Sequence, residues 1–190
     1  MTLAIIATVV VLSILSPVLV SAIILFPYIR AGVARAQILV SLRSVAKERG
    51  FVFKPLRRFA FLSLNTSRGY DFLLISKQKI LAIKLWSAVN TQNTALVCRD
   101  RVLLERSVTP EPISAGEKPR RSVRIKKRRF PSLECNFPTK SKRPIETLIL
   151  YCPQYSATYV QSDGGNIPLK LGDSLFGATV CDQKTIYRFL

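Results

Sequence analysis

The stretch that decides the class of this protein is Leu3–Phe26, LAIIATVVVLSILSPVLVSAIILF, which carries no charged side chain. A helix rises about 1.5 Å per residue, so this stretch would reach roughly 36 Å, enough to cross the hydrocarbon core of a bilayer with some tilt. A buried helix of a globular domain seldom stays uncharged for so long. We therefore expect a transmembrane anchor over residues 1–29, with Tyr28 at the level of the headgroups.

A cleaved signal peptide is the main alternative for this segment. Such a peptide would begin with basic residues and would have a shorter apolar core. No Lys or Arg occurs before Arg30, and the apolar run continues beyond the small residues Ser21 and Ala22. These features favour an anchor that is retained.

The charges that follow the apolar stretch predict its orientation. Basic residues lie close to its carboxyl end, at Arg30, Arg35, Arg43, Lys47 and Arg49. Because the cytoplasmic flank of a membrane helix is usually the basic one, we expect the amino terminus outside the cell and residues 30–190 in the cytoplasm. The predicted location is the cell membrane, with a single pass.

Composition limits the chemistry of the remaining domain. The 190-residue chain contains 29 Lys and Arg, 11 Asp and Glu and no His, and its net charge is +18. The absence of His excludes the nucleophile–imidazole pairs of hydrolases and most catalytic zinc sites. The four Cys lack zinc-knuckle spacing, and reduced thiols are expected in the cytoplasm. We expect no cofactor, and polyanions are the expected partners.

Apolar periodicity predicts an α+β fold, with the anchor and a juxtamembrane helix followed by a mainly antiparallel β-rich domain. Residues 30–107 should form the juxtamembrane helix, over 31–49 with Gly50 as its stop, and a β-meander. Residues 108–144 contain six Pro and should be a basic, mobile loop. Strands within 145–190 should complete the domain, with a strong strand at 147–152.

One predicted hairpin, YDFLLISKQKILAIKLW over residues 70–86, brings an acid and a base together. If Lys77 and Gln78 form its two-residue loop, Asp71 lies directly opposite Lys84. Ile80 and Trp86 share a face with Lys84, which is thus a charge among apolar neighbours. One interpretation is a cross-strand ion pair that fixes the register.

The same hairpin resembles the core of restriction-endonuclease-like nucleases, including the nuclease-related domain of some membrane-associated bacterial proteins. That resemblance implies an Asp at the start of one strand, matched by Asp71, and an acid-x-Lys on the next, matched in part by Lys84. Ala82 replaces the second acid that would hold magnesium, and Glu48 matches an accessory acid on the preceding helix. With one ligand lost, we expect no metal site and no catalysis.

More broadly, the layout resembles uncharacterised small membrane proteins of clostridia and related bacteria. The shared pattern is an anchor, a basic helix ending at 47–50, an Asp-Phe hairpin, an apolar strand ending at Pro153 and a Gly-Asp pair at Gly172 and Asp173. This resemblance implies no activity.

The Pro-rich loop carries the main candidate binding residues. Between Glu117 and Arg143 there are eleven basic and two acidic residues. Lys and Arg clusters close to an anchored membrane are typical of binding to anionic lipids. The candidates are Arg120, Arg121, Arg124, Lys126, Lys127, Arg128 and Arg129.

The sequence therefore predicts a membrane-anchored, non-catalytic binding or scaffolding module whose basic loop contacts anionic lipid headgroups. The alternative is a membrane-tethered nucleic-acid-binding protein with a degenerate nuclease-like core. A third interpretation is a subunit of a larger membrane complex, in which Ser13, Ser16 and Ser21 would face another helix.

Overall fold

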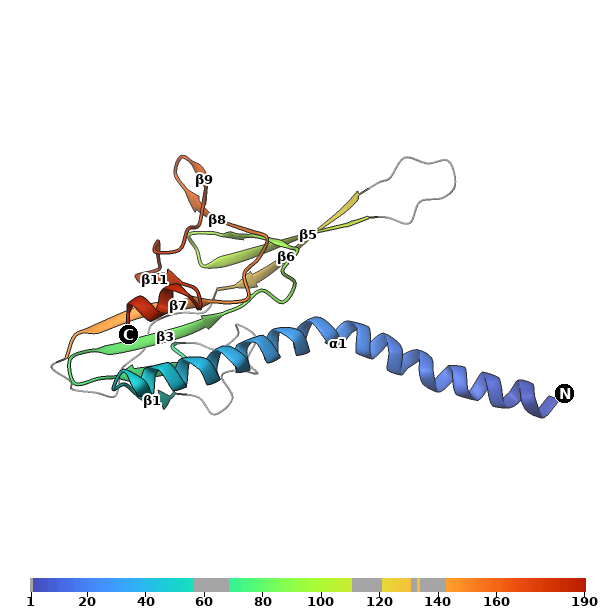
Figure 1. Ribbon diagram of the computed structural model, residues 1–190. Helices are drawn as coiled ribbons and strands as arrows, with labels where there is room; N and C mark the ends of the chain where they lie inside the picture. The colour runs from blue at the N-terminus through green and yellow to red at the C-terminus, as the bar shows by residue number, and fades with distance from the viewer. Residues whose placement is uncertain (1, 57–68, 111–120, 131–132, 134–142) are drawn as a thin grey trace.

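A computed structural model describes residues 2–56, 69–110, 121–130, 133 and 143–190. It shows a mixed α/β protein that is built mostly from β-strands, with one long helix, α1 (Thr2–Glu48), along one side (Figure 1). The first sheet has the order β1 (Val52–Pro55), β2 (Phe72–Ile75), β3 (Ile80–Trp86), β7 (Ile145–Tyr151), β11 (Ala178–Cys181) and β10 (Ser174–Leu175). The second has the order β6 (Arg121–Arg129), β5 (Val102–Pro110), β4 (Thr94–Val97), β8 (Ala157–Ser162) and β9 (Gly165–Pro168). A 3-10 turn, η1 (Thr185–Arg188), lies near the carboxyl terminus.

The predicted juxtamembrane helix is the carboxyl-terminal part of α1, which is continuous from Thr2. The helix ends where the sequence predicts, because Gly50 takes up a left-handed conformation with φ +75°. The amide of Phe51 donates to the carbonyl of Ala46 at 2.8 Å, and that of Gly50 to Lys47 at 3.1 Å. These two bonds form the Schellman cap that satisfies the last carbonyls of a helix.

The backbone of Leu3–Phe26 is helical, as predicted. The side chains of residues 2–18, 22–24 and 27 lie outside the described ones. In the part of the chain that the structure describes, no helix is long and apolar enough to cross a membrane. The anchor stays a prediction.

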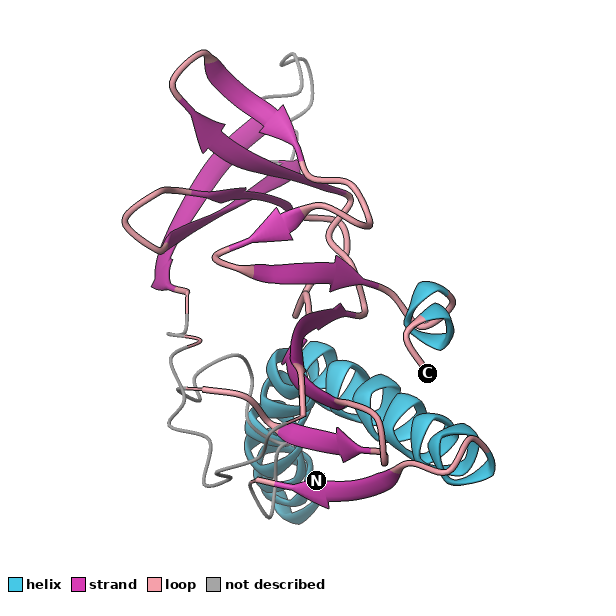
Figure 2. Ribbon diagram, turned by 90° about the vertical axis from the view of Figure 1, so that its left-hand side faces the viewer, coloured by secondary structure: helices cyan, strands magenta, loops and turns pink. Residues whose placement is uncertain are grey.

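The first sheet is covered on both faces, which is why every residue of β3 is buried. Leu81, Ile83 and Leu85 point to one side, where they form a core with Ile38 and Leu42 of α1. Figure 2 shows α1 behind strands of the first sheet at the bottom of the view, and the second sheet at the top. The face of α1 that carries Ile38 and Leu42 therefore packs on the first sheet.

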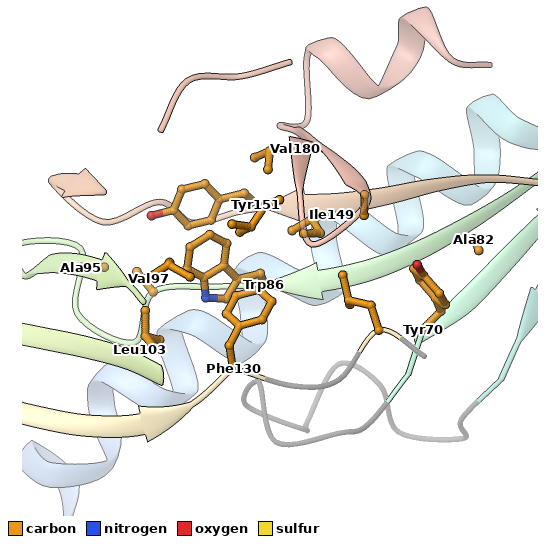
Figure 3. Close-up of a cluster of buried hydrophobic side chains, with 14 of the residues drawn as sticks. Tyr70, Ala82, Trp86, Ala95, Val97, Leu103, Phe130, Ile149, Tyr151 and Val180 are labelled. Atoms are coloured by element: carbon orange, nitrogen blue, oxygen red, sulfur yellow. The ribbon is translucent and has the colours of Figure 1, made fainter. Parts of the chain in front are cut away.

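The opposite face of β3 forms a second, more aromatic core between the sheets (Figure 3). Trp86 stacks on Tyr151 with ring centroids 4.3 Å apart, and Phe130 meets the same indole edge-on at 5.1 Å. Ala82 belongs to the same cluster. The sheets are thus joined around Trp86, at the end of β3.

The predicted meander is wrong beyond β3. β3 pairs in parallel with β7, from Ile80↔Ile145 to Trp86↔Tyr151, whereas β4 begins the second sheet and pairs with β5 and β8. The strand at 145–151 is as apolar as β3 and takes the neighbouring position, so that both are covered on two faces. Among the described strands antiparallel pairs still outnumber parallel ones.

The prediction of a loop over 108–144 is wrong for residues 108–110, which end β5, and for residues 121–129. The latter form β6, which pairs with β5 along its whole length, from Val102↔Arg129 to Pro110↔Arg121. Backbone hydrogen bonds build this ribbon, so few apolar side chains are needed. Residues 111–120, 131–132 and 134–142 of the predicted loop lie outside the described residues, as does the strand predicted at 59–64.

Candidate functional site

Asp71 and Lys84 meet as the predicted register requires. Next to them Phe72 is opposite Ile83, and the amide of Ser76 donates to the carbonyl of Lys79 at 2.9 Å, which closes the loop. The ammonium of Lys84 lies 3.3 Å from either carboxylate oxygen of Asp71. The amide of Leu85 donates to Asp71 Oδ2 at 2.8 Å. The carboxylate is therefore held by a cation and by the backbone.

This ion pair is sealed from solvent. The side chains of Lys84 and Asp71 are 1% and 2% exposed. Ala82, which takes the place of a second acid, is fully buried in the aromatic core. Within the described residues there is no group of three His, Cys, Asp or Glu side chains that could hold a metal ion.

Glu48 lies away from the Asp71–Lys84 pair. It is exposed at the end of α1, where Ser44 Oγ donates to its carboxylate at 3.4 Å. The helix residue whose charge acts on Asp71 is Arg35. Glu48 lies roughly 20 Å further along the helix axis at 1.5 Å per residue.

Arg35 is the buried side chain that sequence reasoning did not select. It is fully buried, and its Nε donates to Ser87 Oγ at 2.5 Å. Ser87 Oγ in turn donates to the carbonyl of Cys152 at 2.6 Å. Burial lowers the pKa of Arg35, and the negative charge of Asp71 opposes this effect. The signal available in the sequence is its helical spacing, because at 100° per residue Arg35 lies on the same side of the helix as Ile38 and Leu42.

Arg35 therefore links three elements through polar contacts. α1 supplies the guanidinium, the end of β3 leads into Ser87, and β7 leads into Cys152. A buried guanidinium must find hydrogen-bond partners, so this contact fixes where the helix lies on the sheet.

A second buried polar group joins the two sheets. The hydroxyl of Tyr155 donates to Glu105 Oε1 at 2.5 Å, and the guanidinium of Arg128 lies 3.6 Å from the same oxygen. Burial and Glu105 raise the pKa of Tyr155. Arg128 thus sits on the inward face of β6 and neutralises a buried carboxylate, which makes it a structural residue rather than the exposed contact that the sequence suggested.

The other predicted basic residues lie on or beside β6. The exposed ones are Arg124, Lys126, Lys127 and Arg129. Arg121 begins the strand, with its side chain outside the described ones, and Arg120 lies outside the described residues. Because side chains alternate along a strand, Lys127 and Arg129 share the outward face, whereas Arg124 and Lys126 share the face of Arg128.

No protein-family model, no curated protein and no solved structure matches this chain.

Proposed function

We propose that this chain is a single-pass membrane protein whose β-rich domain is a non-catalytic binding module held against anionic lipid. The observation that carries this proposal is the basic hairpin formed by β5 and β6. It extends from the domain in the same direction as the amino-terminal half of α1, to the right in Figure 1. Its exposed cations would lie beside the bilayer that the helix enters.

The exposed surface of α1 supports the anchor. Leu19 is 61% exposed, Leu25 53% and Phe26 63%. Large apolar side chains that are exposed on one helix are typical of a surface that contacts a membrane or another protein. Phe26 and Arg30 also line a cavity of ≈ 360 Å³ with residues 88–92, which marks where α1 leaves the domain.

Electrostatics supports anionic lipid as the ligand. Each Lys or Arg near an anionic leaflet contributes about 1 kcal/mol of binding at low ionic strength. Arg124, Lys126, Lys127 and Arg129 are together on one hairpin. An anchor keeps them within reach of the surface, so a modest energy per residue is enough to orient the domain.

The burial of Asp71 and Lys84 supports a role without catalysis. A catalytic carboxylate has to reach a substrate or a metal ion, whereas this one is 2% exposed and is already held by Lys84 and Leu85. In this proposal the Asp71–Lys84 ion pair has a structural role.

Lysine acylation on the full-length protein in lipid nanodiscs tests lipid contact. Lys126 and Lys127 should react more slowly in phosphatidylglycerol discs than in phosphatidylcholine discs, and high salt should abolish the difference, because the attraction is screened. Lys184, which is exposed beside η1 near the carboxyl terminus, serves as the internal control. Equal reactivity of the hairpin lysines in both lipids would refute the proposal.

The second candidate is a membrane-tethered nucleic-acid-binding protein. Tyr159 favours it, since this ring is 37% exposed and lines a groove with Arg106, an arrangement suited to base stacking. A labelled single-stranded oligonucleotide should then bind with a steep salt dependence. Magnesium-dependent cleavage that disappears in Asp71→Ala would promote this candidate to a nuclease.

A further inference from the structure

The outward face of the basic hairpin is apolar as well as cationic. Val108 and Val123 lie directly opposite each other on β5 and β6, and they are 51% and 47% exposed. Ile125, two residues along the same face, is 66% exposed. Three aliphatic side chains are thus grouped on the part of the hairpin furthest from the aromatic core.

This apolar surface continues across the second sheet. Ile125 lines a groove of ≈ 390 Å³ together with Leu96, Leu104 and Tyr159. The pairing Leu96↔Leu104 and Leu96↔Tyr159 places these three side chains in one row across β5, β4 and β8. These residues and the hairpin aliphatics together define the outer face of the second sheet, which carries apolar side chains on each of β6, β5, β4 and β8.

Cations alternate with the apolar side chains on this outer face. Arg106 is opposite Ile125, Lys127 is opposite Leu104, and Arg129 stands at the end of the same strand. On the strands that the structure describes, no Asp or Glu occupies this face, because Glu105 points inward to Tyr155. The outer face is therefore amphipathic, because it combines aliphatic groups with cations and its described strands add no anion to it.

We infer that this outer face inserts its aliphatic side chains into the interfacial region of an anionic leaflet, as a second membrane contact beside α1. The inference rests on the proposed function and specifies how the hairpin contacts lipid. Long Lys and Arg side chains reach up to phosphates while the aliphatic groups enter the acyl boundary. The hairpin also extends in the direction of the amino-terminal half of α1 (Figure 1).

Other occupants fit this face less well. A nucleic-acid platform uses several aromatic rings, whereas Tyr159 is the one aromatic residue among those that line the groove. A second copy of this chain would bring the same cations against one another, and like charges at an interface oppose association. An anionic bilayer satisfies both the charge and the aliphatic groups.

Tryptophan fluorescence of the full-length protein in nanodiscs tests the insertion. The single native Trp is Trp86, which is 1% exposed, so an added Trp reports its own surroundings after the wild-type signal is subtracted. In Ile125→Trp, anionic discs should shift the emission of the new residue to the blue, and brominated acyl chains should quench it. Val52→Trp, at a position 66% exposed on β1 of the other sheet, is the matched control and should show neither change.

The outcomes separate this inference from the proposed function. An unquenched Trp at position 125, in discs where Lys127 is protected from acylation, would overturn the insertion and leave electrostatic contact standing. Loss of lysine protection in the wild type would instead overturn the proposed function.

A second variant tests the energetic role of the aliphatic groups. Val123→Ser/Ile125→Ser should retain protection of Lys127 at low salt but lose it at a lower salt concentration than the wild type does. Unchanged salt dependence would overturn the inference. Protection of Lys127 by a single-stranded oligonucleotide without lipid would also overturn it, in favour of nucleic acid.

Discussion

At the scale of single residues, the buried pair Asp71–Lys84 ties the register of β2 to that of β3. Lys84→Met would remove one cation from the buried carboxylate of Asp71, on which the charge of Arg35 still acts, and we expect it to lower the free energy of unfolding by about 3 kcal/mol. Urea unfolding in mild detergent, followed by the fluorescence of buried Trp86, measures this loss. Asp71→Asn/Lys84→Met removes both charges and should lose less than the single variant.

A surface pair provides the control for that measurement. Lys79 and Glu146 are 3.2 Å apart, with side chains 27% and 42% exposed. Lys79→Met should therefore lower stability by less than about 1 kcal/mol. If Lys79→Met and Lys84→Met lower the free energy of unfolding by similar amounts, burial does not explain the contribution of the Asp71–Lys84 pair to stability.

At the scale of elements, the end of α1 depends on the conformation of Gly50. An L-residue with φ +75° is strained, although nothing lies within 4 Å of an added Cβ. Gly50→Ala should therefore lower the free energy of unfolding by about 1–2 kcal/mol through the backbone alone. Gly164 has equally open surroundings without a positive φ, so Gly164→Ala should be nearly neutral in the same urea experiment. Equal effects would contradict a conformational origin.

Elements fixed by neighbouring residues could be predicted from the sequence, and those fixed by distant partners could not. The register of Asp71 against Lys84 follows from one short loop, and the stop at Gly50 from one residue. The parallel pairing of β3 with β7 joins residues far apart in the chain, and nothing local distinguishes it from continued pairing with β4. The buried position of Arg128 was missed because its partners, Glu105 and Tyr155, come from two other segments.

At the scale of the whole molecule, the apolar stretch and the charged residues occupy different parts of the sequence. The amino-terminal half of α1 and the basic hairpin nevertheless extend from the domain in the same direction (Figure 1). Every charged residue follows the Leu3–Phe26 stretch. The helix continues beyond that stretch without a break and is locked onto the first sheet through Arg35. A rigid helix of this kind would transmit the orientation of an anchor to the domain, and the basic hairpin would then face the leaflet without a flexible linker.

The direction in which the anchor crosses the membrane can be tested with the native thiols. Among the described cysteines, Cys98 and Cys152 are half-buried and Cys181 is buried, and all three are free. Burial raises the pKa of Cys181 to about 12, so it is a protonated thiol at neutral pH and should react only after unfolding. A membrane-impermeant maleimide should therefore label Cys98 only once cells are permeabilised, because we place the domain in the cytoplasm. Labelling of Cys98 in intact cells would reverse the topology and make extracellular polyanions the targets of the hairpin. The late reaction of Cys181 in either case provides the control that the domain is folded during labelling.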